Sequence, residues 1–334
     1  MKALVLHKPG QASIEAVPEP VVTNGNILLR VKMVGLCGSD LNSFRGLNPL
    51  VSFPRIPGHE VCGTVVQGDG SVPKGNDVAV FPYTSCGQCG SCQRGRPNAC
   101  QFNQTLGVQR DGALTEFIAM PPENLYPATL TPKELCLVEP LTVGFHAVAR
   151  GRVTATDMVA IFGCGGVGLG AVSASNARGA TTICIDVDDN KLKLARAAGG
   201  DHSINSMKES LHDRLLEMTD GRGPDVVIEA VGTPATFRAA VEEVAFTGRV
   251  VYIGYAKEPV SYETRLFVQK ELDILGSRNA QADDFRAVIR LLETRKFPVN
   301  DVVSLIVPLE QGPNALRSWS EKPSRFTKIL VSLD

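Results

Sequence analysis

Two short stretches carry residues that together could hold a zinc ion. Cys37 opens the stretch Cys37-Gly-Ser-Asp40, and His59 and Glu60 follow Gly58 in the second. A thiolate, an imidazole and a carboxylate suit Zn²⁺ with one coordination position left open. Cys37 and His59 lie 22 residues apart, so only the fold can bring them together. The alternative is a buried cysteine beside a surface His-Glu pair, because cysteine is often simply part of a core.

A second candidate metal site lies in residues 86–100. Its four cysteines have spacings of 3, 3 and 8, and they are Cys86, Cys89, Cys92 and Cys100. This pattern fits one tetrahedral site of four thiolates, which leaves no position for water. We therefore expect a structural zinc that holds a lobe with almost no apolar core. An iron–sulfur cluster, which would imply electron transfer, and four unligated thiols are the alternatives.

A further carboxylate, Glu139, ends the apolar run before Pro140. A carboxylate buried there needs a partner or a metal. We expect Glu139 to be a zinc ligand or to orient zinc-bound water, and the alternative is a glutamate at a helix start, since proline suits a first helical turn. His146 lies in an apolar helical pattern and is expected in the core.

A glycine-rich turn follows the apolar strand expected at 158–162 and precedes a helix of small residues at 169–177. The turn consists of Gly163, Cys164, Gly165, Gly166, Val167 and Gly168. Its glycines allow close approach to a pyrophosphate at a helix N-terminus. The next strand, 181–185, ends at Asp186, which is placed to accept a hydrogen bond from an adenosine ribose and to repel a 2′-phosphate. NAD is therefore favoured over NADP.

The elements that must position these residues change in kind along the chain. Residues 1–149 contain short strands separated by turn residues and predict a mostly β domain. Residues 150–281 alternate strands and helices, which predicts an α/β domain with a parallel doubly wound sheet and a ligand crevice at the carboxyl ends of its strands. The strand ends expected to contact the cofactor are Val231, Gly254 and Ser277. In the last segment, 282–334, a strand at 328–332 is expected to return to the first domain.

Composition excludes several classes of function. The net charge of −1 offers no electrostatic attraction for nucleic acid or an anionic membrane. No apolar run approaches the length of a membrane span. Nine cysteines without a secretory signal indicate thiolate ligands in a reducing compartment, so we expect a cytoplasmic protein.

Taken together, these motifs make the chain similar over nearly its whole length to the zinc-dependent medium-chain dehydrogenases of the alcohol/sorbitol dehydrogenase superfamily. It is most similar to the L-galactonate, L-gulonate and L-idonate 5-dehydrogenases and the starvation-sensing dehydrogenase. The short sequence motifs shared with that subfamily are Arg45-Gly46, Pro54-Arg55, Gly95-Arg96, Asn98-Ala-Cys100, Gly107-Val108, Asp111-Gly112 and Gly276-Ser-Arg-Asn-Ala280.

The resemblance implies a GroES-like catalytic domain, a Rossmann domain, NAD and two zinc ions per chain. The catalytic zinc would take Cys37, His59 and Glu60, with Glu139 as an exchanging ligand or a partner of the water. It would polarise the substrate hydroxyl while hydride passes to the nicotinamide. Ser39 matches the hydroxyl of the family's proton relay. Many relatives have a histidine where this chain has Asn42, and a neutral amide cannot take up a proton, so the outer route runs through the cofactor ribose or through water and Glu139.

Three functions follow from the resemblance. The first is oxidation of a secondary hydroxyl, at C5 of an L-hexonate such as L-gulonate or L-galactonate; the second is a polyol or secondary-alcohol dehydrogenase; the third is a non-catalytic regulator that binds NAD and zinc. An acid substrate needs a cation, and Arg45, Arg110 and Arg278 are the candidates. Relatives form dimers or tetramers, and strand 249–254 is expected to continue a sheet across a two-fold axis in a homodimer or homotetramer.

Overall fold

The computed structural model describes residues 1–23, 25–68 and 70–333. The chain forms two compact units. Unit 1 contains Met1–Glu139, Gln281–Arg295 and Val299–Asp334, and unit 2 contains Pro140–Ala280 and Lys296–Pro298. The division falls inside helix α3 (Pro132–Arg150), whereas the sequence placed the first boundary at 149/150.

Unit 1 is built on a mixed sheet of seven strands. The order is β14-β15-β3-β4-β5-β7, and β6 also pairs with β3. These strands are β3 (Ile27–Leu36), β4 (Glu60–Gln67), β5 (Asp77–Val80), β6 (Phe117–Met120), β7 (Leu125–Pro127), β14 (Val303–Pro308) and β15 (Lys328–Ser332). A separate hairpin joins β1 (Lys2–Lys8) to β2 (Gln11–Ala16). The helices of this unit are α1 (Gly38–Phe44), α2 (Gly90–Gln93), the first part of α3, α9 (Ala282–Glu293), α10 (Val299–Val302) and α11 (Gly312–Glu321).

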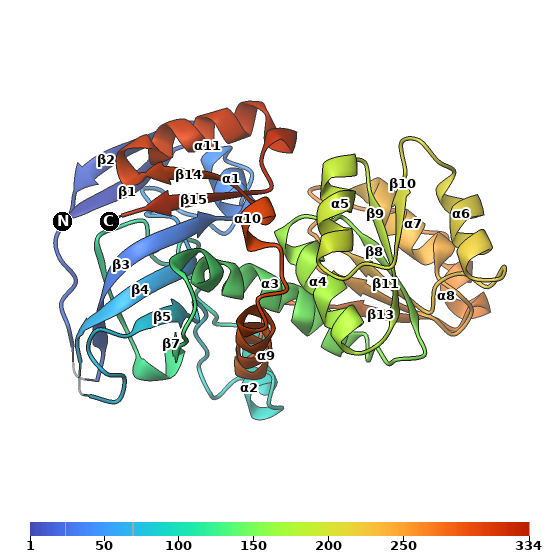
Figure 1. Ribbon diagram of the computed structural model, residues 1–334, viewed down its shortest axis with the longest axis horizontal. Coiled ribbons are helices and arrows are strands. Elements are labelled where there is room, and N and C mark those ends of the chain that lie inside the picture. Colours follow the sequence, from blue (N-terminus) through green and yellow to red (C-terminus); the bar gives the residue numbers. More distant parts are fainter. Residues whose placement is uncertain (24, 69, 334) are drawn as a thin grey trace. The chain divides into compact units, whose positions relative to one another are not determined.

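The end of the chain returns to the sheet of unit 1, as predicted. Strand β15 lies antiparallel to β3 and pairs Ile329 with Leu36, and Figure 1 shows the red β15 beside the blue β3. Leu36 immediately precedes Cys37, so this pairing brings the last strand to the first candidate zinc ligand.

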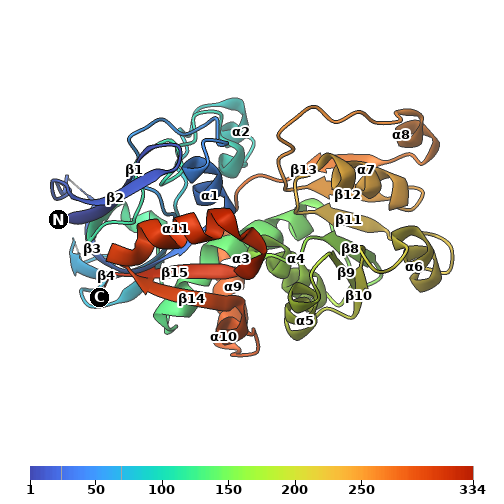
Figure 2. The same ribbon diagram turned by 90° about the horizontal axis from the view of Figure 1, so that it is seen from above.

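Unit 2 is a parallel sheet of six strands in the order β10-β9-β8-β11-β12-β13, visible in Figure 2. Its strands are β8 (Met158–Phe162), β9 (Thr181–Asp186), β10 (His202–Asn205), β11 (Val226–Glu229), β12 (Arg249–Tyr252) and β13 (Asp273–Gly276). Its helices are the second part of α3, α4 (Gly166–Ala177), α5 (Asp189–Ala197), α6 (Leu211–Met218), α7 (Pro234–Glu243) and α8 (Arg265–Gln269). The predicted doubly wound sheet is confirmed, with the reversal of strand order between β8 and β11.

One detail of unit 2 differs from the sequence analysis. Strand β12 is interior, between β11 and β13, so strand 249–254 is not the strand that could continue the sheet across a two-fold axis; on that side the edge strand is β13. Helix α6 begins at Leu211, because the Ser210 hydroxyl accepts the Asp213 N–H and caps the helix there.

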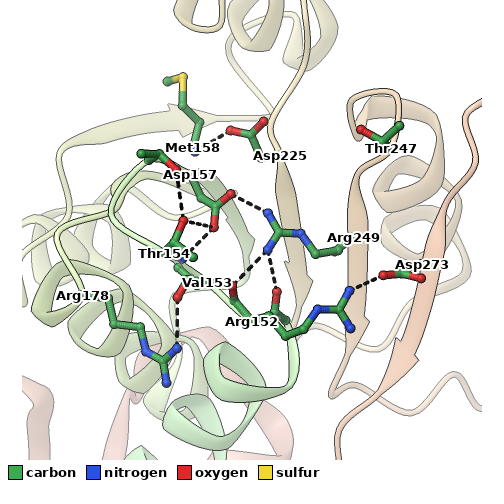
Figure 3. A network of polar contacts seen from close by, with 12 residues as sticks. Arg152, Val153, Thr154, Asp157, Met158, Arg178, Asp225, Thr247, Arg249 and Asp273 are labelled. Atoms are coloured by element: carbon green, nitrogen blue, oxygen red, sulfur yellow. Dashed lines mark hydrogen bonds and ion pairs between the residues drawn. The ribbon is translucent and has the colours of Figure 1, made fainter.

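The ends of the unit 2 strands remote from the glycine turn are held by an arginine (Figure 3). Arg249 on β12 forms an ion pair with Asp157 and donates from Nη1 to the carbonyls of Gly151 and Arg152 at 3.0 and 3.1 Å. Asp157 also accepts the Thr154 N–H at 2.6 Å. Because Asp157 immediately precedes β8, these contacts tie β8 to β12 at the amino ends of the strands. The carboxyl ends of the strands stay open to ligands. Among the described residues, no helix is long and apolar enough to cross a membrane.

Candidate active site and cofactor cavity

The predicted zinc ligands of the first site come together in unit 1. Cys37 is the N-cap of α1, directly after β3, and Glu60 is the first residue of β4, directly after His59. One ligand atom from each lies within 4.8 Å of the other two. Gly58 adopts φ +99°, a conformation that favours glycine, and so lets the chain turn into His59. The donor set and its spacing fit a zinc ion.

Asp40 connects the two ligand stretches, a role that the sequence analysis did not assign. Its carboxylate accepts the N–H of Cys37 at 2.9 Å and the N–H of Gly58 at 3.1 Å. The same carboxylate lies 3.8 Å from Nδ1 of His59, a buried nitrogen with no hydrogen-bond partner. Burial opposes protonation of His59, but Asp40 and Cys37 raise its pKa well above 6.5. The site therefore has an excess of negative charge, which favours a bound cation.

Glu60 has a buried partner that the sequence analysis missed. Nζ of Lys328 donates to the two carboxylate oxygens of Glu60 at 2.6 and 2.7 Å and to the Leu36 carbonyl at 3.3 Å. Glu60 is 0% and Lys328 5% exposed. Burial lowers the pKa of Lys328, yet Glu60 and Cys37 raise it above its usual value. No local signal marks Lys328, because only the pairing of β15 with β3 brings it here.

Glu139 lies within α3 and not at a helix start, so that alternative is wrong. It is 5% exposed and accepts a hydrogen bond from the hydroxyl of Tyr83, which is also buried. Burial and the neighbouring Glu60 charge raise the pKa of Glu139, while His59 and Tyr83 oppose the rise. Glu139 is not a member of the three-residue ligand group. Glu139 lies close enough to His59 and Glu60 for their charges to affect its pKa, as expected of an exchanging ligand.

The predicted proton-relay hydroxyl lies beside the same ligands. Oγ of Ser39 is 3.5 Å from Nε2 of His59, at the limit of a hydrogen bond. Asn42 lies one helical turn further along α1. An amide at this position offers no group that titrates, so any route for the proton beyond Ser39 must use other groups.

The four cysteines of the second predicted site also converge. Their sulfur atoms lie within 4.8 Å of one another, with Cys89 3.5 Å from Cys92 and 3.7 Å from Cys100. A tetrahedron with Zn–S bonds of about 2.3 Å requires S–S distances of about 3.8 Å. Backbone N–H groups donate to two of the sulfurs, Cys86 and Cys100, at 3.3–3.4 Å. The Ser91 hydroxyl and the Cys92 N–H lower the pKa of Cys89 to about 5, whereas burial and the Cys89 side chain raise the pKa of Cys92 to about 11, so this pair favours one thiolate, on Cys89.

A cavity of about 460 Å³ lies at the carboxyl ends of the strands of unit 2. Of the predicted cofactor residues, it is lined by Gly163, Gly165, Asp186 and Val231. Gly166, Val167 and Gly168 form the first turn of α4. A Cβ on Gly168 would lie 1.8 Å from the Gly163 carbonyl, so glycine is required for the turn to pack on the helix. This size and position suit a dinucleotide.

The other two predicted cofactor residues, Gly254 and Ser277, do not line this cavity. A Cβ on Gly254 would lie 2.5 Å from the Glu229 carboxylate, so Gly254 permits close packing behind β11 and β12. The Ser277 hydroxyl, just after β13, is buried without a hydrogen-bond partner.

Asp186 has a second role that its position in the sequence does not reveal. Its carboxylate accepts three backbone N–H groups, from Cys164 and Val187 at 2.8 Å and from Asp188 at 3.1 Å. A carboxylate has about four acceptor sites, so one remains for a ligand hydroxyl. The contact with Cys164 ties the glycine turn to β9. Lys191, which the sequence analysis did not select, lines the same cavity and adds a cation to it.

The three candidate arginines differ in their surroundings. Arg45 donates from Nε to the Ser320 hydroxyl at 3.0 Å and also to the Ser320 carbonyl. Arg110 donates from Nη2 to the Pro82 carbonyl at 3.3 Å, and its buried Nε has no partner among the described residues. Arg278 belongs to unit 2.

Residues 23–130 match the alcohol dehydrogenase GroES-like domain, and residues 166–294 match the zinc-binding dehydrogenase family. Sorbitol dehydrogenase of Bacillus subtilis is 32% identical over 99% of this chain and 97% of its own length. L-galactonate-5-dehydrogenase of Escherichia coli is 30% identical over 89% of this chain and 88% of its own. The solved structure of the RspB alcohol dehydrogenase of Escherichia coli, complexed with NADH, has a TM-score of 0.91 and 29% identity, covering 100% of this chain and 99% of that one.

The chain belongs to the zinc-binding dehydrogenases. It is a zinc-dependent medium-chain dehydrogenase with NAD as its second cofactor, and its two parts are a GroES-like domain and a Rossmann-type domain. The predicted family, fold and type of enzyme are confirmed. An iron–sulfur protein is not supported, because the match is to a zinc-binding family.

Proposed function

We propose that this dehydrogenase oxidises the secondary hydroxyl at C5 of an L-hexonate to the keto acid, and that it reduces the keto acid in the reverse direction. The observation that carries the chemistry is the convergence of Cys37, His59 and Glu60 from separate elements. The similarity to L-galactonate-5-dehydrogenase, together with the sequence motifs shared with that subfamily, supports a sugar acid as the substrate. A non-catalytic regulator would have no need of this ligand set.

In the proposed mechanism Cys37, His59 and Glu60 would hold the catalytic zinc, and Cys86, Cys89, Cys92 and Cys100 would hold the structural one. When bound, zinc supplies a Lewis acid that lowers the pKa of the substrate hydroxyl, and NAD accepts the hydride. Gly163, Gly165 and the first turn of α4 would receive the pyrophosphate, and Asp186 the ribose.

The remaining groups of the chain hold ligands and move the proton. Asp40 orients His59 and the two ligand stretches. Ser39 is the first group to take the substrate proton, and Asn42, a neutral amide, cannot accept that proton in turn. Glu139, with its hydroxyl donor Tyr83, is placed to replace Glu60 when Lys328 holds the Glu60 carboxylate.

Oxidation of a polyol by the same mechanism is the second candidate. It is favoured by the similarity to sorbitol dehydrogenase, whose identity to this chain is 32%. The experiment that separates the two is a screen for NADH formation over hexonates, the corresponding alditols and simple secondary alcohols. The sugar-acid proposal requires a higher kcat/KM for an L-hexonate than for its alditol, and the reverse order would assign the enzyme to polyols.

The proposal also covers the cellular compartment and the oligomeric state of the enzyme. The thiolate sets need a reducing compartment, so we place it in the cytoplasm. A homodimer or homotetramer stays a prediction, for which the edge strand β13 replaces β12 as the strand available for pairing. Sedimentation at micromolar concentration measures the state of assembly directly.

A further inference from the structure

Arg110 is a half-buried cation of unit 1 that the mechanism above does not use. Among the residues that the structure describes, its only side-chain hydrogen bond is the one from Nη2 to the Pro82 carbonyl, at 3.3 Å, and its buried Nε has no partner there. Within residues 1–23, 25–68 and 70–333 it forms no ion pair. Burial lowers the pKa of Arg110, as expected for a charge removed from water without compensation.

Two other cations of this protein that are largely removed from water have carboxylate partners. Lys328 is paired with Glu60, and Arg249 with Asp157. The acid next to Arg110, Asp111, is already engaged, because Oδ1 accepts from Arg55 at 3.0 Å and from the Ile56 N–H at 3.1 Å. A buried charge without a partner reduces stability, so a protein that retains one has a use for it.

The loop that carries Arg110 packs on both segments that supply the catalytic residues. The Gly107 N–H donates to the Arg110 carbonyl at 2.9 Å, and a Cβ on Gly107 would lie 2.6 Å from the backbone nitrogen of Gly58, next to His59. On the other side, Pro82 accepts from Arg110 and immediately precedes Tyr83, the donor to Glu139. Arg110 therefore belongs to a loop that contacts the residues next to His59 on one side and next to Tyr83 on the other.

We propose that Arg110 binds the anionic group of the substrate, a carboxylate or a phosphate, and thereby sets the preference for an acidic over a neutral polyol. This proposal rests on the proposed dehydrogenase function and names its specificity residue. The guanidinium has a planar pair of donors that matches either anion. Arg45, in contrast, already has two contacts with Ser320 and serves as the matched control.

The test compares Arg110→Met, Arg110→Lys and Arg45→Met with the wild type in the zinc-loaded enzyme. The substrates are L-gulonate, its neutral alditol and the phosphate ester of that alditol. A charge-assisted contact is worth about 1.5–3 kcal/mol, or about 10- to 150-fold. Arg110→Met should lower the ratio of kcat/KM for the anion over the alditol by that factor. Arg110→Lys should lower it less, because it retains the charge, and Arg45→Met should leave the ratio unchanged.

A thermal unfolding measurement distinguishes binding from a structural role. Arg110→Met should unfold at the same or a higher temperature than the wild type, because it removes an uncompensated charge; a fall in unfolding temperature together with an unchanged ratio would overturn the proposal. If the enzyme oxidises the phosphate ester and not the hexonate, and the variant lowers that ratio, Arg110 is supported while the sugar-acid function fails. If neither anion is oxidised, calorimetric titration with L-gulonate and inorganic phosphate decides: weaker binding by Arg110→Met supports the proposal, and equal or absent binding overturns it.

Discussion

Lys328 and Glu60 form a buried ion pair across strand β3, which lies between their own strands, β15 and β4. The pair can form because Gly35, opposite Glu60 on β3, has no side chain. A Cβ at Gly35 would lie 2.0 Å from Oε2 of Glu60. A predicted metal ligand is thus held by a lysine from the last strand, in space left free by the missing side chain of Gly35.

Replacing Lys328 with Met should destabilise the metal-free protein by about 3–5 kcal/mol, because the buried Glu60 carboxylate would lose its partner. Zinc should restore part of that loss by neutralising Glu60, so the increase in unfolding temperature on adding zinc should be larger than in the wild type. Lys328→Arg, which keeps the charge, is the control. Equal denaturation midpoints for wild type and Lys328→Met without metal would contradict this account of the pair.

Replacing Gly35 with Ala should push the Glu60 carboxylate out of its position and cost about 1–3 kcal/mol through overpacking. Activity should fall together with zinc content. Gly38→Ala is the matched control for stability, since a Cβ there meets nothing within 4 Å. Denaturant unfolding of both variants measures the difference, and a Gly35→Ala protein as stable as Gly38→Ala would show that the sheet relaxes around the added methyl group.

Two zinc ions per chain are expected, with different roles, because the two ligand groups have different chemistry. Cys37→Ser should abolish turnover with little change in unfolding temperature. Cys92→Ser should lower the unfolding temperature, because a closed zinc site contributes directly to folding. Elemental analysis of each purified protein gives the stoichiometry. Iron in place of zinc, or equal stability losses for both variants, would refute the assignment.

The preference for NAD over NADP should depend on the charge of Asp186. Asp186→Asn keeps an acceptor for the backbone of the glycine turn but removes the repulsion of a 2′-phosphate. We expect weaker use of NAD and a narrower difference between the two cofactors, with Lys191 available to attract the phosphate. Steady-state kinetics with both cofactors measures this. A wild-type enzyme that prefers NADP would show that the ribose assignment is wrong.

Stability at acid pH should depend on Glu134 near the start of α3. Burial alone would raise the pKa of Glu134, but the Arg295 guanidinium and the N–H and hydroxyl of Thr131 lower it below 4.5. The ion pair therefore stabilises the fold above the unfolded-state pKa of about 4.3, and this contribution disappears as pH falls through the lower folded-state value. Glu134→Gln should unfold at a lower temperature than wild type at pH 7. The difference should shrink below about pH 4; a constant difference would exclude this carboxylate as the cause.

The sequence by itself indicated the family, through its resemblance, together with the two-domain plan, both candidate ligand sets and the glycine turn. The four-cysteine set and the turn follow from local spacing: four cysteines within 15 residues, or glycines between a strand and a helix, have the same meaning wherever the chain places them. The buried position of His146 was also predicted, because apolar neighbours indicate a core. Helix α3 was not predicted as a whole, since Pro140 in its interior reads as an interruption.

Only the tertiary structure decided which groups surround those ligands. Lys328 lies 268 residues from Glu60, and Tyr83 lies 56 residues from Glu139. The missing side chain of Gly35 makes room for the Lys328–Glu60 pair only because β15, β3 and β4 are neighbours. The same holds for Arg110, one of three arginines that the sequence could not rank, because a missing partner is a property of the folded surroundings. Charge burial and pairing depend on strand order, and strand order is a long-range outcome of packing that no local pattern encodes.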